Sequence, residues 1–310
     1  MGAGCAGVKV KWIWIPAVAL LAACGQILRD PSGDPHPSYS AALFMGSSLV
    51  LQVFPSHGEE FYVRVPAGGQ WFSADGRVVY RIGDGVLSAY DIKDGKIRVL
   101  TDITEFRRLE DIAVTATGDK AVISGTYGHD DKARSGLFLV DFATREVTFI
   151  VEQMGHANDY LTSWIHFSVS PDGHRLAGTA QKGQIGIVNL TEHKVEKLWS
   201  GTNASISPDG RWIAATDFTA SMNITLIDLS DFSKQRSLGS AGRKRPVWSP
   251  DSRYLLVWKS ELWCIMGFGY FGTLEELDIQ TGVRTTVTSS RCKVNTAGAF
   301  WVNNEDVRFK

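Results

Sequence analysis

Short apolar runs separated by polar turns recur along most of the chain, and this pattern favours β-strands over helices. The segment from Ser205 reads SISPDGRWIAA, and close copies begin at Ser168, Trp248 and Phe72. Asp-Gly between two apolar runs is a strong hairpin signal, because glycine accepts a positive φ and the aspartate side chain bonds back to its own backbone. Each copy therefore predicts a strand, a tight turn and a second strand.

A second motif follows each first one: an apolar strand that runs into Asp or Asn, then an apolar residue and a polar turn, as in LVDFATRE. The first-motif turns centre on Asp75, Asp172, Asp209 and Asp251, with a degenerate copy at Thr117-Gly118. The second-motif markers are Asp91, Asp141, Asn189, Asp228 and Asp278. Two hairpins per unit predict four antiparallel strands, with Asp172 and Asp209 capping their own turns rather than acting as catalytic carboxylates.

Five complete units occupy residues 70–290, and successive second-motif markers are 50, 48, 39 and 50 residues apart. A period of about 40 to 45 residues marks four-stranded propeller blades. We expect FWVNNEDVRF, turning at Asn303-Asn304, and LVLQVFPSHGEEFYVRV, turning at His57-Gly58, to supply one hairpin each to a sixth blade. The predicted fold is all-β: a six-bladed β-propeller of four-stranded antiparallel blades. Pairing of N- and C-terminal strands closes it and removes exposed sheet edges.

The SPDG turns and hydrophobic-Asp-Leu strands resemble the TolB-type (WD40-like) propeller repeat, which also occurs in prolyl oligopeptidase and dipeptidyl peptidase propellers. Residues 171–173 and 208–210 match best, and the resemblance covers most of the chain. In the TolB resemblance, an α/β domain precedes the propeller, and we find no room for such a domain here. The Pal and colicin partners of TolB therefore do not carry over. The Gly-x-Ser-x-Gly elbow of the peptidases does not occur in the sequence, which argues against a peptidase.

The N-terminal segment has the pattern of a secretory signal peptide: Lys9 and Lys11 precede a short apolar run from Trp12 to Ala23. The sequence LAACG, with Cys24, resembles the bacterial lipobox, in which the cysteine is lipidated and becomes the new N-terminus. The alternatives are a plain cleaved signal or an uncleaved anchor. We therefore expect a signal peptide over residues 1–23, a lipid-anchored tether over 24–40 rich in Pro, Ser and Gly, and a TolB-like propeller over 41–310.

Charge and cysteine content narrow the classes of partner. Without residues 1–23 the chain carries 30 Lys and Arg against 33 Asp and Glu, a net charge of −3. Nucleic-acid-binding surfaces concentrate positive charge, so we expect no nucleic-acid partner. Cys264 and Cys292 remain after Cys5 and Cys24 are set aside, and in an oxidising compartment they form either a disulfide or two free thiols.

Loops that exceed the repeat are the expected binding elements, because binding residues concentrate on loops held by a rigid scaffold. The longest are GTYGHDDKARSG and KSELWCIMGFGYFG, between second and third strands, and the junction containing MGHANDYLTSWIHF. Strand alternation places all three on one face, which we call the loop-expanded face. We expect this face to bind a partner through aromatic residues and arginines, which is the composition of binding hot spots. The alternative is that some of these rings pack the loops against the tops of the blades. The residues are Tyr127, His129, Tyr160, Trp164, Arg243, Arg245, Trp263, Phe268, Tyr270 and Phe271.

The favoured hypothesis is a non-enzymatic, monomeric bacterial lipoprotein that faces the periplasm and binds a protein or peptide of the cell envelope. Gly25 after the lipidated cysteine favours the outer membrane, with the membrane contacted only through the lipid. The chief alternative is an enzyme with a polar site in the central channel acting on a sugar or small metabolite; a purely structural envelope component is the third. We expect no cofactor and no metal, since the His129 and His156 loops lack tetrahedral Cys/His spacing.

Overall fold

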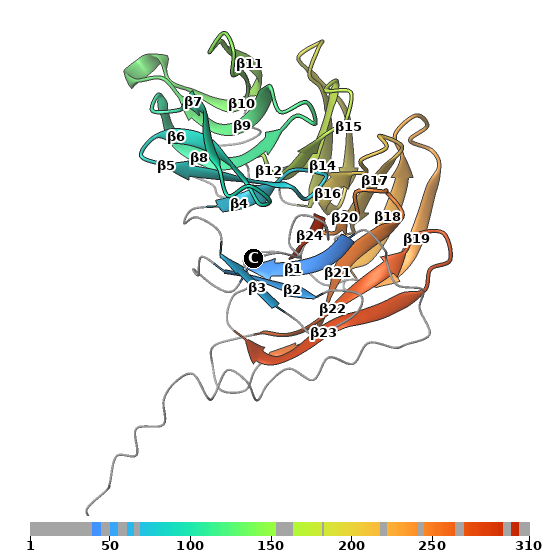
Figure 1. Cartoon of the computed structure of the whole chain (residues 1–310). Coiled ribbons are helices and arrows are strands. Elements are labelled where there is room, and N and C mark those ends of the chain that lie inside the picture. The colour runs from blue at the N-terminus through green and yellow to red at the C-terminus, as the bar shows by residue number, and fades with distance from the viewer. Residues whose placement is uncertain are drawn as a thin grey trace, which may run out of the picture.

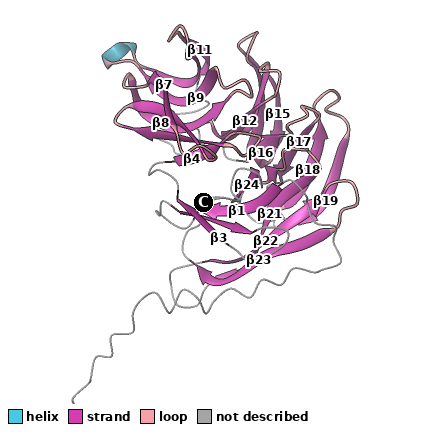
Figure 2. Ribbon diagram, in the orientation of Figure 1, coloured by secondary structure: helices cyan, strands magenta, loops and turns pink. Residues whose placement is uncertain are grey.

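The computed structural model describes residues 39–44, 50–54, 61–64, 69–152, 164–181, 183–217, 222–240, 245–263, 270–293 and 299–303. The elements in these ranges are strands, apart from one 3-10 turn, η1 (Asp130–Lys132), in the β9–β10 connection (Figure 2). The strands form four-stranded antiparallel sheets arranged around a common centre (Figure 1). The prediction of an all-β propeller of four-stranded antiparallel blades is confirmed.

Five blades are each built from four consecutive strands. Blade 1 contains β4 (Gly69–Phe72), β5 (Val78–Gly83), β6 (Val86–Asp91) and β7 (Ile97–Asp102). Blade 2 contains β8 (Phe106–Val114), β9 (Lys120–Tyr127), β10 (Arg134–Asp141) and β11 (Val147–Glu152). Blade 3 contains β12 (Ile165–Val169), β13 (Arg175–Gln181), β14 (Gln184–Asn189) and β15 (Lys194–Ser200). Blade 4 contains β16 (Thr202–Ile206), β17 (Trp212–Thr216), β18 (Asn223–Asp228) and β19 (Gln235–Ser240). Blade 5 contains β20 (Val247–Trp248), β21 (Tyr254–Trp263), β22 (Tyr270–Asp278) and β23 (Arg284–Lys293).

A further sheet joins the two ends of the described chain in the order β24-β1-β2-β3, and we call it the terminal sheet. It contains β24 (Ala299–Asn303), β1 (Tyr39–Phe44), β2 (Val50–Phe54) and β3 (Phe61–Arg64). The expectation of a six-bladed propeller, with a sixth blade of one hairpin from each end of the chain, is thereby corrected to five blades of consecutive strands plus this composite sheet. Among the described residues, its C-terminal contribution is the strand β24, which pairs directly with β1, a strand that the sequence analysis did not predict.

The terminal sheet lies between blade 5 and blade 1. Burial raises the pKa of the Tyr39 hydroxyl in β1, and Asp251 of blade 5 and Asp75 of blade 1 add to this effect while Arg77 opposes it. Charged side chains of both flanking blades thus lie close enough to Tyr39 to act on it electrostatically. Trp301 in β24 is buried and donates its indole N–H to the carbonyl of Val247, the first residue of β20, at 3.1 Å. Pairing of β1 with β24 therefore joins the ends of the propeller.

The recurring aspartates are turn caps, as predicted. Four first-motif serines donate their hydroxyls to the aspartate two residues on, at 2.5 to 2.6 Å, in the turns of Asp75, Asp172, Asp209 and Asp251. In the degenerate blade 2 turn the carboxylate comes from Asp119 instead, which accepts from both Thr115 and Thr117. The residue after each second-motif marker donates its backbone N–H to the residue two positions after the first-motif centre, as Leu229 does to Arg211. Both turns of a blade therefore lie together, on a face that we call the turn face.

The core lies between successive blades rather than in one central cluster. Val122 and Leu137 of blade 2 pack with Phe167 and Leu176 of blade 3, and comparable clusters fill the seams between blades 1 and 2, 3 and 4, 4 and 5, and between blade 5 and the terminal sheet. The inner strands lie side by side: β12 lies against β8 and β16, β16 against β20, and β20 against β24. Burial between neighbouring blades removes apolar surface from water on both faces of each sheet. The inner strands can then carry polar side chains at the centre.

A candidate ligand site at the centre of the propeller

One position of the repeat carries a different polar side chain in four consecutive blades. It lies six residues before the first-motif turn centre, on or just before the inner strand. Blades 2 to 5 place Asp111, His166, Asn203 and Arg245 there, and blade 1 places Gly69. We call these four side chains the inner cluster. Repeat symmetry alone would bring them around one centre, and the electrostatic interactions of the side chains described below agree with that placement.

Local backbone irregularity accompanies this position. The pairing register of the inner strand shifts between Leu109 and Asp111 in blade 2, between Ile165 and Ser168 in blade 3, and between Thr202 and Ser205 in blade 4. His166 and Asn203 adopt positive φ values of 52° and 57°. Bulges re-aim side chains, and non-glycine residues in this region cost about 1 to 3 kcal/mol each, a cost that clusters at functional sites.

The Asp111 carboxylate is held by three donors from three blades. Trp71 of β4 donates its indole N–H at 2.7 Å, the Ile112 backbone N–H donates at 2.9 Å, and Phe167 of β12 donates its backbone N–H at 3.4 Å. Asp111 therefore links blades 1, 2 and 3 at the centre. A carboxylate with this many fixed donors is a positioning group rather than a free base.

His166 faces the centre from between two buried anchors. Trp164 is fully buried between blades 2 and 3, and Phe167 is 1% exposed in the same core, whereas the His166 side chain itself is exposed. Desolvation by surrounding protein lowers the pKa of His166, and Arg245 lowers it further, while Asp111 and a hydrogen bond with Asn203 oppose the shift. A crowded but water-accessible imidazole is neutral at pH 7, with one ring nitrogen as donor and the other as acceptor.

Arg245 supplies the positive charge of the cluster. It is half-buried just before β20, and its guanidinium makes no hydrogen bond or ion pair within the described part of the chain. Burial lowers its pKa, and Asp111 opposes that effect. A guanidinium in a protein remains charged, and a buried charge is costly unless paired. The cluster thus offers a cation and a neutral imidazole to a ligand, and the buried Asn203 amide bonds to that imidazole. The described ranges contain no group of His, Cys, Asp and Glu able to hold a metal ion.

The inner cluster lies toward the loop-expanded face. In blade 2, Tyr127 pairs with Arg134 where β9 runs into the β10 connection, and Glu152 at the end of β11 pairs with Gly136. The second-to-third strand connection and the blade-to-blade junction therefore emerge at the same end of the blade, as predicted. His166 and Asn203 are each the second residue of a strand that follows such a junction.

Two predicted rim residues make contacts within their own blade. Tyr127 is half-buried and packs edge-on against Phe106, with ring centroids 5.0 Å apart. His129 is exposed and contacts Glu105 at 3.1 Å, while Arg107 donates to its other ring nitrogen at 3.3 Å. In this arrangement the Tyr127 ring closes the top of blade 2, and His129 lies on the surface beside an acidic and a basic neighbour.

The expectation that Trp164 contacts a partner is corrected by its burial. Its ring end stands where a side chain at Gly186 would be, with Cη2 2.3 Å from the Cβ position. The aromatic content of this junction therefore partly serves the core.

Of the remaining predicted residues, Arg245 belongs to the inner cluster, and Trp263 pairs with Tyr270 and Leu262 with Phe271 across the β21–β22 hairpin.

The remaining predicted site and cysteine residues lie outside the described residues or have only their backbone described. Tyr160, Arg243, Phe268, Cys264 and Cys24 lie outside the described residues. Cys292 belongs to β23, and only its backbone is described. The described residues include no helix long and apolar enough to cross a membrane.

Sequence reasoning missed Asp111, His166 and Asn203. The signal was available: one column of the repeat alignment holds Gly69 in blade 1 and then Asp, His, Asn and Arg in the four blades that follow. A scaffold role would favour the same residue type in each blade, as it does for the turn aspartates. Variation between blades at a centre-facing position points instead to a surface that contacts something other than the blades.

Comparison with known proteins places the fold in the TolB-like propeller class. No family model and no curated protein matches the sequence. Among solved structures, TolB from Acinetobacter baumannii is similar with a TM-score of 0.60 at 16% identity, over 87% of this chain and 67% of that one. Oligogalacturonate lyase from Vibrio parahaemolyticus matches with a TM-score of 0.53 at 12% identity, over 84% of each chain. A putative 6-phosphogluconolactonase from Bacteroides fragilis matches with a TM-score of 0.51 at 14% identity, over 88% and 100%.

Proposed function

We propose that this protein is a non-enzymatic binding protein of the bacterial cell envelope, whose loop-expanded face receives a protein or peptide segment that carries a carboxylate. The observation that carries this proposal is the inner cluster, in which Arg245 has no carboxylate bonded to it within the described residues. Guanidinium groups bind carboxylates in a bidentate geometry, and the neutral imidazole of His166, positioned by its bond with Asn203, can hydrogen-bond the adjoining peptide group.

The long loops around the cluster would provide the contact area that a protein partner needs. In this proposal Tyr160, Arg243, Trp263, Phe268, Tyr270 and Phe271 form the rim, with His129 at its edge. Aromatic and arginine side chains dominate binding energy in such surfaces. The similarity to TolB supports the propeller scaffold that would hold this surface and does not bear on the partner.

Anchoring belongs to the same proposal. Cleavage before Cys24 and lipidation of its thiol would tether the propeller through residues 24–40 to the periplasmic face of the outer membrane. More than one acyl chain is needed for stable anchoring, since one chain binds only marginally. Mass spectrometry of the mature N-terminus tests this directly: the expected result is a diacylglyceryl-modified Cys24, and an unmodified N-terminus elsewhere would overturn it.

A second candidate is an enzyme that acts on a sugar or small metabolite at the inner cluster. The observation that favours it is the convergence of His166, in strained backbone, with Asp111 and Arg245. In that case His166 would serve as the general base, because a neutral imidazole accepts a proton near pH 7. Asp111 accepts from three donors, so it would position its neighbours whether the protein is a binding protein or an enzyme.

In-cell crosslinking followed by pull-down tests the two candidates. The variants are Arg245→Gln and Tyr160→Ala with Trp263→Ala, and the control is Arg98→Gln, which removes an exposed guanidinium from β7. A partner captured by the wild type and the control but lost with Arg245→Gln supports the binding role. A partner list unaffected by any variant would contradict it. A purified wild type that retains a small molecule in native mass spectrometry, lost on His166→Gln, would favour the enzyme.

A further inference from the structure

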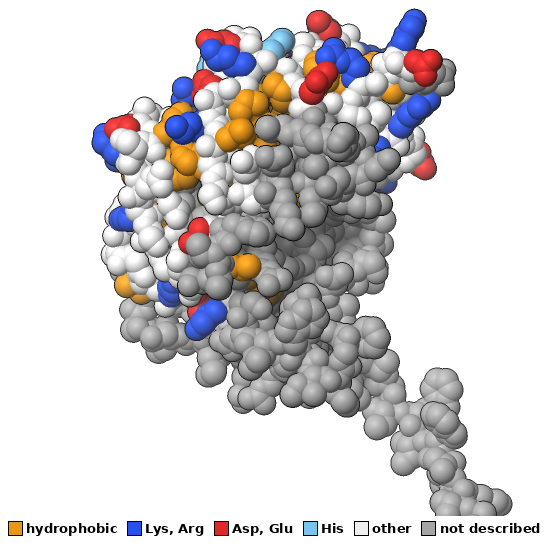
Figure 3. All heavy atoms as spheres, turned by 180° about the vertical axis from the view of Figure 1, so that it is seen from behind, with side chains coloured by type: hydrophobic (Ala, Val, Ile, Leu, Met, Phe, Trp, Pro, Cys, Tyr) orange, Lys and Arg blue, Asp and Glu red, His pale blue; other side chains and the backbone are white. Residues whose placement is uncertain are grey.

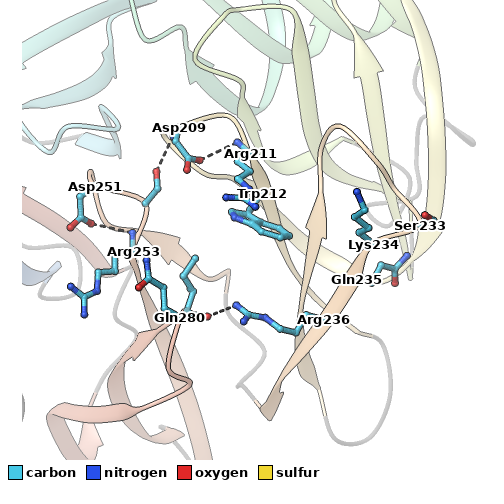
Figure 4. Close-up of a pocket in the computed structure, with 12 residues that line it drawn as sticks. Asp209, Arg211, Trp212, Ser233, Lys234, Gln235, Arg236, Asp251, Arg253 and Gln280 are labelled. Carbon is cyan, nitrogen blue, oxygen red and sulfur yellow. Dashed lines mark hydrogen bonds between the residues drawn. The ribbon is translucent and has the colours of Figure 1, made fainter.

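A groove on the turn face runs along the seam between blades 4 and 5, away from the inner cluster. It encloses about 730 Å³, within the range of small-molecule sites. The first-motif turns of Asp209 and Asp251 contribute one part of its lining, and β19 and the turn after Asp278 contribute the rest (Figure 4). We call it the seam groove.

The lining is rich in cations whose charges are only partly balanced. Arg211, Lys234, Arg236 and Arg253 line the groove, against the two carboxylates of Asp209 and Asp251. Both carboxylates are already committed to their own turns, where each accepts from a serine hydroxyl and from the backbone N–H two residues on. These bonds engage the carboxylate oxygens with neutral donors, and the electrostatic effect of Asp251 falls on Arg253.

The two arginines contributed by blade 4 have no carboxylate partner among the described residues. Arg211 is exposed, and its guanidinium lies over the Trp212 ring, 4.9 Å from the ring centroid. Arg236 donates to the carbonyl oxygen of Ile279 in blade 5. Arg253, in contrast, is paired with Asp278 at 3.0 Å, and Lys234 contacts Asp231 at 3.3 Å. Arg211 and Arg236 thus leave unused donors facing one cavity.

The neighbouring seam shows that this excess is not a general property of the repeat. Between blades 3 and 4, Arg175 likewise donates to a carbonyl across the seam, that of Leu229, at 3.3 Å. There, however, Arg175 is also paired with Glu196 at 3.0 Å. The first-turn position equivalent to Arg211 is His174 in blade 3. The seam between blades 4 and 5 therefore combines the same interblade bond with uncompensated positive charge.

We propose that the seam groove is a second binding site, which takes a small anion carrying two or more carboxylate or phosphate groups. Guanidinium groups match the planar oxygen pairs of both groups and donate two parallel hydrogen bonds to them. Arg211 and Arg236 would hold separate anionic groups, and Lys234 would add a third positive charge. The partner proposed for the loop-expanded face is not needed for this site.

Isothermal titration of the full-length protein in detergent tests the proposal with pyrophosphate and citrate as probes. Arg211→Gln is the informative variant, because the two hydrogen bonds that Arg211 makes in the turn come from its backbone, which the substitution retains. Arg98→Gln is the matched control, with the same loss of an exposed guanidinium in blade 1. We expect at least one probe to bind the wild type and the control alike, and Arg211→Gln to weaken it about tenfold.

Each outcome decides the question. Binding of pyrophosphate alone identifies a phosphoryl ligand, binding of citrate alone identifies a polycarboxylate, and binding of both identifies the shared chemistry. No binding of either probe at about 10 mM, which corresponds to an interaction too weak to be specific, would overturn the proposal. Equal loss in Arg98→Gln and Arg211→Gln would also overturn it, because it would show non-specific attraction to the net charge.

Discussion

Trp71 of blade 1 donates its indole N–H to the Asp111 carboxylate of blade 2 at 2.7 Å, and this bond fixes the acidic member of the inner cluster. Asp111 also receives the Phe167 backbone N–H of blade 3. One side chain therefore serves both the assembly of three blades and the electrostatics of the centre. On the face seen in Figure 3, Lys and Arg are interspersed with Asp and Glu.

Substitutions at the inner cluster should move the His166 pKa in opposite directions. Asp111 raises this pKa and Arg245 lowers it. We expect Asp111→Asn to lower the pKa further and Arg245→Gln to raise it, as measured by NMR titration of the imidazole resonances. A shift of the same sign in both variants would contradict the proposed placement of the two charges.

The lowered pKa of His166 also predicts how stability depends on pH. The unfolded chain has the ordinary histidine pKa of about 6.5, so below that value the unfolded state binds a proton that the folded state resists. The stabilisation from this group is complete above pH 6.5 and is lost as the pH falls toward the lowered folded-state value. Urea unfolding at a series of pH values should show this loss in the wild type, and His166→Gln should reduce it. An unchanged pH profile would count against a desolvated His166.

Removing a turn cap should reduce stability without affecting ligand binding. Asp172 accepts from the Ser170 hydroxyl at 2.5 Å and from the His174 backbone N–H at 3.0 Å. We expect Asp172→Ala to cost about 1 to 2 kcal/mol of unfolding free energy. Asp94→Ala is the control, because Asp94 is exposed and contacts only exposed Lys96 at 3.6 Å in an ion pair, and such pairs contribute about 0 to 1 kcal/mol. Equal effects of the two substitutions would refute the capping role.

Packing of Trp164 against Gly186 predicts a steric effect. A Cβ at Gly186 would stand 2.3 Å from Cη2 and 2.6 Å from Cζ3 of the fully buried ring. We expect Gly186→Ala to destabilise the fold by about 1 to 3 kcal/mol, because a packed core resists added volume. Gly83→Ala should be near neutral, since its new Cβ would meet only the flexible end of Arg81. Thermal unfolding of both variants distinguishes overpacking from a general cost of replacing glycine.

Removing β24 should expose an edge of the terminal sheet. Deletion of residues 299–310 leaves the backbone of β1 unpaired on one side and removes the buried Trp301. Unpaired strand edges template association between chains, so we expect dimers or aggregates by light scattering. Deletion of residues 304–310 retains β24 and provides the control. A monomeric, fully folded 299–310 deletion would contradict the role assigned to the pairing of the chain ends.

The sequence by itself determined the blades, because their signals are local. Asp209 caps the turn in which it occurs, and the alternation around it defines two adjacent strands, so a short window contains the cause and the effect. The same holds for the loop-expanded face, which follows from strand alternation alone.

Only the tertiary structure decided what the centre contains and how the ends join. Asp111 and Arg245 are far apart in sequence, and they share one electrostatic environment only because the blades place the same repeat position around one axis. Trp164 was expected on the partner-binding surface, yet it is buried between blades 2 and 3, because a large aromatic ring gains more from burial there than the sequence pattern reveals. Local patterns encode hydrogen bonds along the chain, whereas packing between blades depends on which surfaces meet in three dimensions.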